Sequence, residues 1–312
     1  LYIRLRCTEM GGKIKTRHGE IIGSKGSQDR LLEILYNNPA GKFLLKGLTA
    51  PVVSKAAGAF YDSALSRRLI LPFIKTAGID MSEYESCSFR SFNEFFTRKI
   101  RSERRKIDKT PEAFISPCDS KLSVYKIDEH SRFIIKNGIY STASLLKCPK
   151  LAEKYNGGLC MIFRLEVDDY HRYIYPDNGV KSRNYHIQGK YHTVNPIALD
   201  SVDIYKENTR EFTILHTENF GDVIQIEVGA MLVGRIKNHH EKYCFKRGEE
   251  KGMFEYGGST VVLLTLPKAV DIDSVFLENT AAGYETIVKM GERIGTGLKF
   301  RQIGDKDGRE KE

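Results

Sequence analysis

The most informative stretch of the chain reads Phe254-Glu255-Tyr256-Gly257-Gly258-Ser259-Thr260-Val261-Val262-Leu263-Leu264. Its two consecutive glycines tolerate backbone conformations that other residues resist, and they place a serine at a tight turn before an apolar strand. From such a turn the Ser259 hydroxyl can reach back to the carbonyl of Gly258. Attack there converts a peptide bond into an ester, and elimination from the ester leaves a ketone-bearing N-terminal group. Gly-Gly-Ser is also common in hairpin turns, so this stretch alone does not establish chemistry.

After Pro111 the chain consists mainly of short apolar runs bounded by Gly, Asn, Asp and Pro, which is the pattern of β-strands. The predicted strands are Lys121–Ile127, Phe133–Ile135, Leu159–Leu165, Phe212–His216, Val223–Val228, Met231–Ile236 and Thr260–Leu266. A helix is predicted over Asp273–Met290, ending before Gly291. We therefore predict an α+β fold in which a β-rich catalytic body with a C-terminal helix follows a helical N-terminal region.

The N-terminal region has apolar residues at helical spacing over residues 29–75, interrupted by Pro39 and Pro51. A charged run, Arg98–Lys109, marks a boundary, and the predicted domains are residues 1–110 and 111–312. Apolar helix faces edged by Lys and Arg suit helices that lie at a membrane interface. They suit ordinary core-packing helices equally well.

The basic charge of the chain is concentrated in its first third. Residues 1–110 hold 21 Lys and Arg against 11 Asp and Glu, whereas residues 111–312 hold 28 against 29. A basic segment can bind an anionic membrane or nucleic acid. Nucleic acid is the weaker reading, because this region has neither a recognised binding motif nor a run of aromatic residues for base stacking.

Membrane-spanning segments, secretion signals and metal sites are not expected. No run of 18 apolar residues occurs, and the N-terminal residues do not resemble a signal peptide. The six cysteines are scattered without a CxxC pair, which is the spacing of neither a zinc site nor a disulfide scaffold.

Two further clusters contain groups suited to catalysis. Residues 164–176 surround His171 with acidic, basic and phenolic side chains, so its imidazole could exchange protons near neutral pH. In Ser116-Pro117-Cys118-Asp119-Ser120, the Asp119 carboxylate could orient a base. The alternatives are a surface turn for the first cluster and a turn cap for the second.

Together and in this order, the three clusters resemble the phosphatidylserine decarboxylase family, over a span from about Ser91 to Gly295. The family's cleavage signature is Gly-Ser followed by Thr or Ser, which Gly258-Ser259-Thr260 meets. Further matching motifs are Asn195-Pro196-Ile197-Ala198, Glu218-Asn219-Phe220-Gly221, Val228-Gly229-Ala230-Met231-Leu232-Val233-Gly234 and Arg247-Gly248-Glu249-Glu250-Lys251-Gly252.

The resemblance implies a proenzyme that cuts itself between Gly258 and Ser259. Residues 1–258 would form a β subunit and residues 259–312 an α subunit, with Ser259 converted into a covalent pyruvoyl group. That group would serve as the electron sink for decarboxylation of phosphatidylserine to phosphatidylethanolamine. No pyridoxal phosphate and no metal would be required.

Site residues also follow from the resemblance. His171 matches a family histidine that handles substrate and proton, and Asp119 matches the acid of an Asp-His-Ser triad for self-cleavage. Many members carry the triad base three residues after the first histidine, where this chain has Ile174. We predict that His192 replaces it, although His192 could equally be structural.

The resemblance also implies partners and a location. The expected partners are phosphatidylserine in a membrane, an anionic membrane surface and the two cleaved subunits, with a homodimer left open. We expect a peripheral protein on the cytoplasmic side of the cell membrane. The alternatives are a phospholipid-binding relative with impaired catalysis, which Ile174 would explain, and a pyruvoyl decarboxylase of a soluble amino acid.

Overall fold

Strand β16 (Ser259–Thr265) lies at the centre of the fold, and all of its residues are buried. Val261 and Leu263 belong to the apolar cluster on one face of the sheet, and Val262 and Leu264 belong to the cluster on the other face. A nearly continuous apolar run is what a strand covered on both faces requires. In the computed structural model, the described residues are 13–22, 58–86, 88–135, 138–189, 208–229, 235–255 and 259–298.

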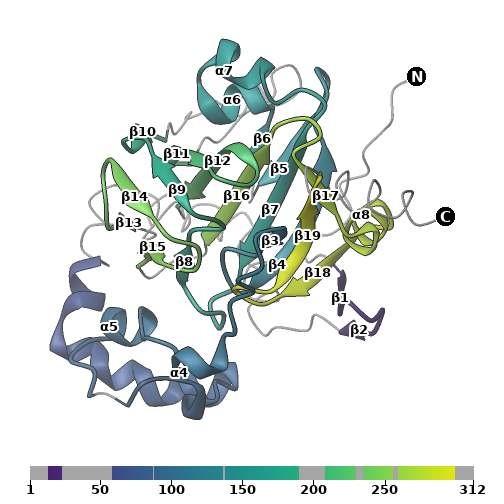
Figure 1. Cartoon of the computed structure of the whole chain (residues 1–312). Helices are drawn as coiled ribbons and strands as arrows, with labels where there is room; N and C mark the ends of the chain where they lie inside the picture. The colour runs from purple at the N-terminus through teal and green to yellow at the C-terminus, as the bar shows by residue number, and fades with distance from the viewer. Residues whose placement is uncertain are drawn as a thin grey trace, which may run out of the picture.

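The described strands run through most of the chain (Figure 1). They are β1 (Lys13–Lys15), β2 (Ile21–Ile22), β3 (Ala113–Ile115), β4 (Ser120–Lys126), β5 (Phe133–Ile135), β6 (Gly138–Tyr140), β7 (Leu159–Leu165), β8 (Arg172–Ile174), β9 (Gly179–Lys181), β10 (Tyr185–Ile187), β11 (Arg210–Thr217), β12 (Gly221–Val228), β13 (Ile236–Asn238), β14 (Tyr243–Phe245), β15 (Glu250–Phe254), β16, β17 (Val270–Ile272), β18 (Tyr284–Val288) and β19 (Arg293–Gly297).

Helical segments are shorter and fewer than strands in the described residues. They are η1 (Ala64–Leu69), α4 (Ile70–Ala77), η2 (Met81–Glu83), α5 (Phe92–Phe96), η3 (Ser102–Arg104), α6 (Thr142–Leu146), α7 (Pro149–Glu153) and α8 (Ser274–Ala281). Residues 58–62 are helical as well. No helix in the described residues is long and apolar enough to cross a bilayer.

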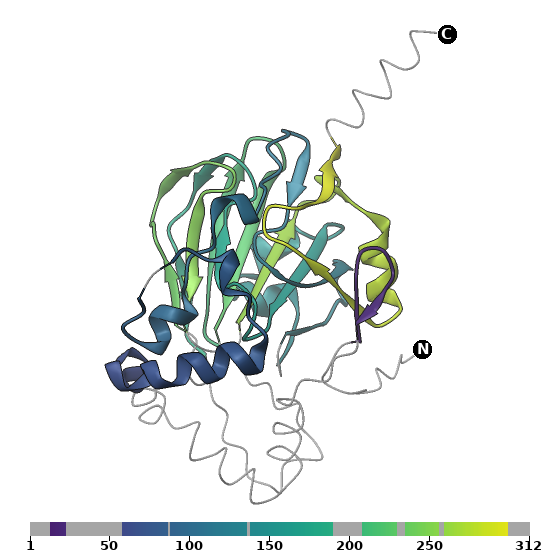
Figure 2. The same cartoon turned by 90° about the horizontal axis from the view of Figure 1, so that it is seen from below.

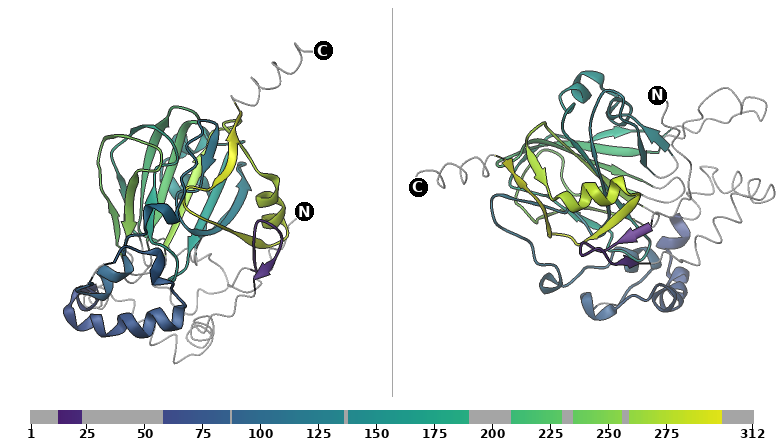
Figure 3. Two further views of the ribbon diagram at one scale, coloured as in Figure 1. Left: turned by 60° about the horizontal axis from the view of Figure 1, so that its bottom comes forward. Right: turned by 90° about the vertical axis from the view of Figure 1, so that its right-hand side faces the viewer.

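One large mixed sheet forms the body, with the strand order β14-β9-β11-β12-β16-β7-β4-β18-β1-β2 and with β10 paired to β11. Two three-stranded sheets, β13-β15-β8 and β17-β19-β3, supply Tyr173, Phe254 and Ile294 to the cluster on one face. The other face is covered by β5, β6, α6 and α7 (Figure 3). The central strands are therefore enclosed on both sides.

The prediction of an α+β fold with a β-rich body is confirmed. Six of the predicted strands coincide with β4, β5, β7, β11, β12 and β16 to within a few residues. The predicted strand Met231–Ile236 lies largely outside the described residues, although β13 begins at Ile236.

The predicted C-terminal helix is correct only in its first half. Helix α8 ends at Ala281, and residues Tyr284–Val288 form strand β18 instead of continuing the helix. Gly283, with φ +79°, adopts a left-handed conformation between the two elements. The β18 backbone then pairs with β4, and this non-local pairing overrides the helical pattern of the sequence.

The N-terminal helices gather at one end of the body (Figure 2). Ile70 of α4 packs against Phe92, Phe95 and Phe96 of α5, and this cluster also contacts Val167 of the body. The helical character predicted for the N-terminal region is confirmed where it is described, and residues 29–57 of that prediction lie outside the described residues. The predicted boundary at residue 110 stays a prediction.

A short N-terminal hairpin was not expected from the sequence. Strand β1 pairs parallel with β18 and antiparallel with β2, so residues 13–22 extend the main sheet. Beside the hairpin, Arg17 forms an ion pair with Asp273 and another with Glu292. This early segment is therefore tied to strands that follow Ser259.

Candidate active site

Ser259 is the first residue of β16 and is 1% exposed. In the register with β7 it lies opposite Leu165. Side chains alternate along a strand, so Ser259 shares its face with Val261 and Leu263, which pack against Phe254. The serine therefore begins a rigid central strand, on the face covered by the β13-β15-β8 sheet.

His171 lies near the segment that leads to this serine. The Phe254 N–H donates to the His171 carbonyl at 2.9 Å, just before β15 ends. At the other end, Ser259 pairs with Leu165. His171 is thus paired with Phe254, and Leu165 is paired with Ser259. Because few residues separate the two pairings along either segment, His171 and Ser259 lie in one region.

The His171 imidazole is buried and held in one orientation. Its Nδ1 lies 2.9 Å from the Asp169 carbonyl, and the Phe96 ring contacts it with a centroid separation of 4.0 Å. A carbonyl only accepts hydrogen bonds, so Nδ1 must carry a proton. In the neutral ring Nε2 is then the basic nitrogen, which is the tautomer that a proton acceptor at Nε2 needs.

Asp119 is buried, but its partners are basic side chains. Its carboxylate accepts hydrogen bonds from Arg105 at 2.6–3.0 Å and from the Met290 N–H at 2.9 Å, with Lys289 Nζ at 3.4 Å. Burial alone would raise the pKa of Asp119, but the Arg105 hydrogen bonds and the Lys289 charge outweigh it and lower the pKa. Asp119 is therefore ionised at neutral pH.

Asp119 directly precedes β4, whereas Ser259 begins β16. Ser120 begins β4, and β7 separates β4 from β16. Two strand spacings correspond to about 10 Å between backbones. A direct hydrogen bond between Asp119 and Ser259 would need a shorter separation, so a triad built on them requires an intermediate group.

Ile174 occupies the sequence position where the family resemblance places a histidine. Its N–H donates to the Pro117 carbonyl at 2.9 Å, which sets it beside the segment that carries Asp119. The side chain is 3% exposed and packs in a cluster with Tyr170 and Met290. In this chain the neighbour of Asp119 is therefore an aliphatic group that cannot transfer a proton.

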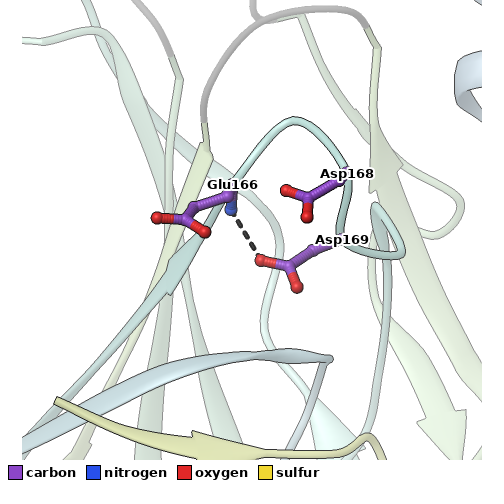
Figure 4. A group of neighbouring side chains, drawn as sticks. All are labelled: Glu166, Asp168 and Asp169. Atoms are coloured by element: carbon purple, nitrogen blue, oxygen red, sulfur yellow. Dashed lines mark hydrogen bonds between the residues drawn. The ribbon is translucent and has the colours of Figure 1, made fainter. Parts of the chain in front are cut away.

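The turn before His171 carries three carboxylates, Glu166, Asp168 and Asp169 (Figure 4). Asp169 accepts a hydrogen bond from the Glu166 N–H at 2.7 Å, which closes the turn. Lys121 Nζ lies 2.7 Å from Asp169 and 2.9 Å from Glu166. Burial raises the pKa of Asp169 to about 6, against the opposing effect of Lys121. The Lys121 ammonium and the Arg164 guanidinium, which lies 2.8 Å from Glu166, supply positive charge at this turn.

A buried ion pair joins the strand that precedes the Gly-Gly-Ser segment to the main sheet. Lys251 Nζ on β15 lies 2.7 Å from Glu227 on β12, and both side chains are fully buried. Asn238 accepts a hydrogen bond from the same ammonium at 2.8 Å. Glu227 is opposite Val261 in the β12–β16 register. The pair therefore links β15 and β12 beside the start of β16.

Gly258 and His192 lie outside the described residues, so their predicted roles stay predictions. Sequence reasoning missed Arg105 and Lys289, the basic partners of Asp119. Arg105 belongs to the charged run Arg98–Lys109, whose pattern indicates a domain boundary and no catalytic role. Its position next to a buried acid could have been suspected only from a spatial model, because the two residues share no local motif.

Comparisons with known proteins identify the family of this chain. Residues 92–296 match the family model described as "Phosphatidylserine decarboxylase". A Clostridium acetobutylicum protein named "Phosphatidylserine decarboxylase proenzyme 2" is 48% identical over 277 residues, covering 88% of this chain and 95% of the relative. Proteins named "Phosphatidylserine decarboxylase proenzyme" are similar too. That of Clostridium perfringens is 42% identical (83% of this chain, 90% of the relative), and that of Desulfitobacterium hafniense is 38% identical (89% and 95%).

Proposed function

This chain belongs to the phosphatidylserine decarboxylase family, and we propose that it is a proenzyme that cuts itself between Gly258 and Ser259 and then decarboxylates phosphatidylserine. The observation that carries the proposal is the position of Ser259. A serine that follows two glycines begins a fully buried central strand, in the region of a buried histidine.

Self-cleavage uses the Ser259 hydroxyl, the preceding peptide bond, a base that accepts the released protons and one water molecule. The hydroxyl oxygen attacks the Gly258 carbonyl carbon, and the acyl group moves from nitrogen to oxygen. Loss of the Ser259 α-proton then breaks the ester C–O bond, which leaves a carboxylate on Gly258. Hydrolysis of the resulting enamine releases ammonia and leaves a ketone at residue 259.

The described residues fit a pyruvoyl group at residue 259. Such a group supplies an electron sink for the electron pair left when carbon dioxide departs. The chain itself holds that position on a rigid strand, excludes water through the β13-β15-β8 sheet, and presents His171 Nε2 as a basic nitrogen. We propose that His171 handles the proton taken up at the former α-carbon.

The two proposed fragments would stay together after the cut. Strand β16 pairs with β12 on one side and β7 on the other, and β18 lies between β4 and β1. Strands of residues 259–312 are thus interleaved with strands of residues 1–258. Separation would break several ladders and expose the central core, so the fragments should part only on denaturation.

Intact mass under denaturing conditions, together with carbon dioxide release from phosphatidylserine, tests the proposed function. We expect two fragments meeting at Gly258 and Ser259, with the smaller one lighter than the serine-terminated peptide by one ammonia, because the water lost in the elimination is regained in the hydrolysis. It should be blocked to N-terminal sequencing. A single chain of 35.5 kDa with no turnover would instead favour an impaired phospholipid-binding relative, which the apolar site at Ile174 would explain.

We propose that His192 supplies the base that Ile174 cannot. His192→Ala is expected to slow self-cleavage by about 10²- to 10⁴-fold, the usual contribution of a general base. The rate is measured from the appearance of fragments on a gel after synthesis. His186→Ala serves as a control, because His186 is an exposed histidine on β10. Normal processing of His192→Ala would contradict the assignment.

We also propose that the N-terminal helices bind an anionic membrane surface. Four exposed apolar side chains within residues 58–77 are called the apolar patch, namely Phe60, Leu65, Leu69 and Leu71; Leu65 is 66% exposed and Leu71 is 70% exposed. Arg67, Arg68 and Lys75 are exposed beside the patch. An apolar surface edged by basic side chains matches the acyl boundary and head groups of an anionic bilayer. This location would give access to a lipid substrate and not to a soluble amino acid.

Leu65→Glu combined with Leu71→Glu is expected to lower binding to phosphatidylserine-containing vesicles by about 10-fold or more. In this proposal the two leucine side chains insert into the bilayer, where carboxylates would be unfavourable. Co-sedimentation with vesicles measures the loss. The control pairs Ile134→Glu with Ile139→Glu, two exposed apolar residues on the β5–β6 hairpin. Equal binding of both double variants would show that the apolar patch does not contact the membrane.

A further inference from the structure

Arg98 carries a buried guanidinium whose hydrogen-bonding capacity is largely unused. The residue is 2% exposed, and its Nε and Nη1 atoms have no hydrogen-bond partner. Only Nη2 is engaged, as a donor to the Tyr84 hydroxyl at 3.1 Å and to the Asp168 carbonyl at 3.3 Å. Buried donors are normally satisfied, and an unpaired buried charge is costly, so an arginine in this state calls for an anionic partner.

The described carboxylates near Arg98 do not supply that partner. Asp119 is paired with Arg105, and Asp169 is paired with Lys121. The guanidinium instead lies over the rings of Tyr84 and Phe95, with its central carbon 4.3 and 5.0 Å from their centroids. Aromatic faces orient a guanidinium without neutralising it.

Arg98 is part of the same assembly as His171. Phe95 packs on the Arg98 guanidinium, and its neighbour Phe96 packs on the His171 ring. Tyr84 and Asp168, which accept the Nη2 hydrogen bonds, also line a cavity together with Asp119 and Tyr170. Arg98 is therefore close to residues that line this cavity, and two of the lining residues, Asp169 and Tyr170, directly precede His171 in the chain.

We propose that Arg98 binds an oxyanion of the phospholipid head group, either its phosphate or its carboxylate, through Nε and Nη1. A guanidinium presents two parallel donors that match the two oxygens of either group. This inference rests on the proposed function, since it assigns the position of that substrate. Helix α5, which precedes Arg98, packs against α4, which carries the exposed Leu71 and Lys75.

Arg98→Met tests the proposal. The KM for phosphatidylserine in mixed micelles is expected to rise by about 10- to 100-fold, the value of a charge-assisted hydrogen-bonded pair. Self-cleavage should continue, and the Tm should not fall, because an apolar side chain of similar length replaces an unpaired charge. Arg98→Lys keeps the positive charge but loses the two parallel donors of the guanidinium, so its KM should lie between those of the wild type and Arg98→Met.

The adjacent Lys99→Met is the matched control. It removes the same charge from a side chain that is 59% exposed, and its KM should equal that of the wild type. Competitive inhibition by phosphatidylethanolamine separates the two oxyanions, since this product keeps the phosphate and lacks the carboxylate. If Arg98→Met weakens inhibition as much as it raises KM, the phosphate is bound; unchanged inhibition assigns the carboxylate.

Two results would overturn the inference. One is an unchanged KM in a cut and active Arg98→Met enzyme; the other is a lower Tm with loss of cutting, which would make Arg98 a structural group. Wild-type protein that is inactive on phosphatidylserine would refute the proposed function instead. Calorimetric binding of glycerophosphoserine to wild type and Arg98→Met would then test Arg98 separately, and equal affinities would refute its role.

Discussion

Replacing Ser259 with alanine is expected to leave one uncut chain of 35.5 kDa that releases no carbon dioxide from phosphatidylserine. The methyl side chain has no oxygen to attack the Gly258 carbonyl, so neither the ester nor the ketone can form. Alanine fits a buried position where serine stands, and the strand keeps its pairing with β12 and β7. The variant should therefore fold and still fail completely in both reactions.

Ser120→Ala is the matched control for Ser259→Ala. Ser120 is also a buried serine at the first position of a strand in the same sheet, with 2% of its surface exposed. The proposed cut does not involve the peptide bond before Ser120, so this variant should be cut like the wild type. Gel analysis and intact mass report cutting for both proteins. Efficient cutting of Ser259→Ala would exclude Ser259 as the nucleophile.

Replacing His171 with alanine is expected to lower kcat for phosphatidylserine by about 10²- to 10⁴-fold while most of the chain is still cut. The reason is the fixed tautomer: the Nδ1 hydrogen bond to the Asp169 carbonyl leaves Nε2 as the basic nitrogen of a buried ring. Without that nitrogen, no group is held in place to accept the proton released when the substrate amine reacts and to return it to the former α-carbon. Self-cleavage should continue, because the proposed proton acceptor for that reaction is His192.

The comparison of turnover with cutting separates a chemical role of His171 from a packing role. Loss of the ring also removes the contact with Phe96, and Phe96→Leu tests that packing while the imidazole remains. Phe96→Leu should affect kcat much less than His171→Ala. His216→Ala removes an exposed histidine paired with Asp222 and should have no effect. If His171→Ala stops cutting as completely as turnover, His171 also serves self-cleavage.

Parts of the fold and the site follow from local sequence. The apolar run Thr260–Leu266 predicts a strand, and the structure places that strand, β16, at the centre of the sheet with both faces covered. The glycines before Ser259 mark the turn that the proposed chemistry uses. The cluster at residues 164–176 likewise indicated His171 as a titratable group, and the structure brings this residue into the region of Ser259. These features depend on residues that are neighbours in the chain, where composition and spacing carry the information.

Other features depended on residues that meet only in the folded protein. Tyr284–Val288 reads as a helix continued from α8, and it became a strand because β4 and β1 offered hydrogen-bonding edges on either side. Asp119 was read as a triad acid, but its observed partners are Arg105 and Lys289, which are distant in sequence. The unpaired donors of Arg98 were equally invisible in sequence.

The sequence by itself determined the class of the fold, the serine at the start of its central strand and the family to which the chain is similar. Hydrophobic patterns and turn residues depend on neighbours in the chain, so they can be recognised from the sequence alone. The tertiary structure decided which charges are neutralised, which buried donor lacks a partner and what surrounds Ile174. Burial and electrostatic pairing are properties of three-dimensional neighbours, because desolvation and Coulomb interactions depend on distance in space.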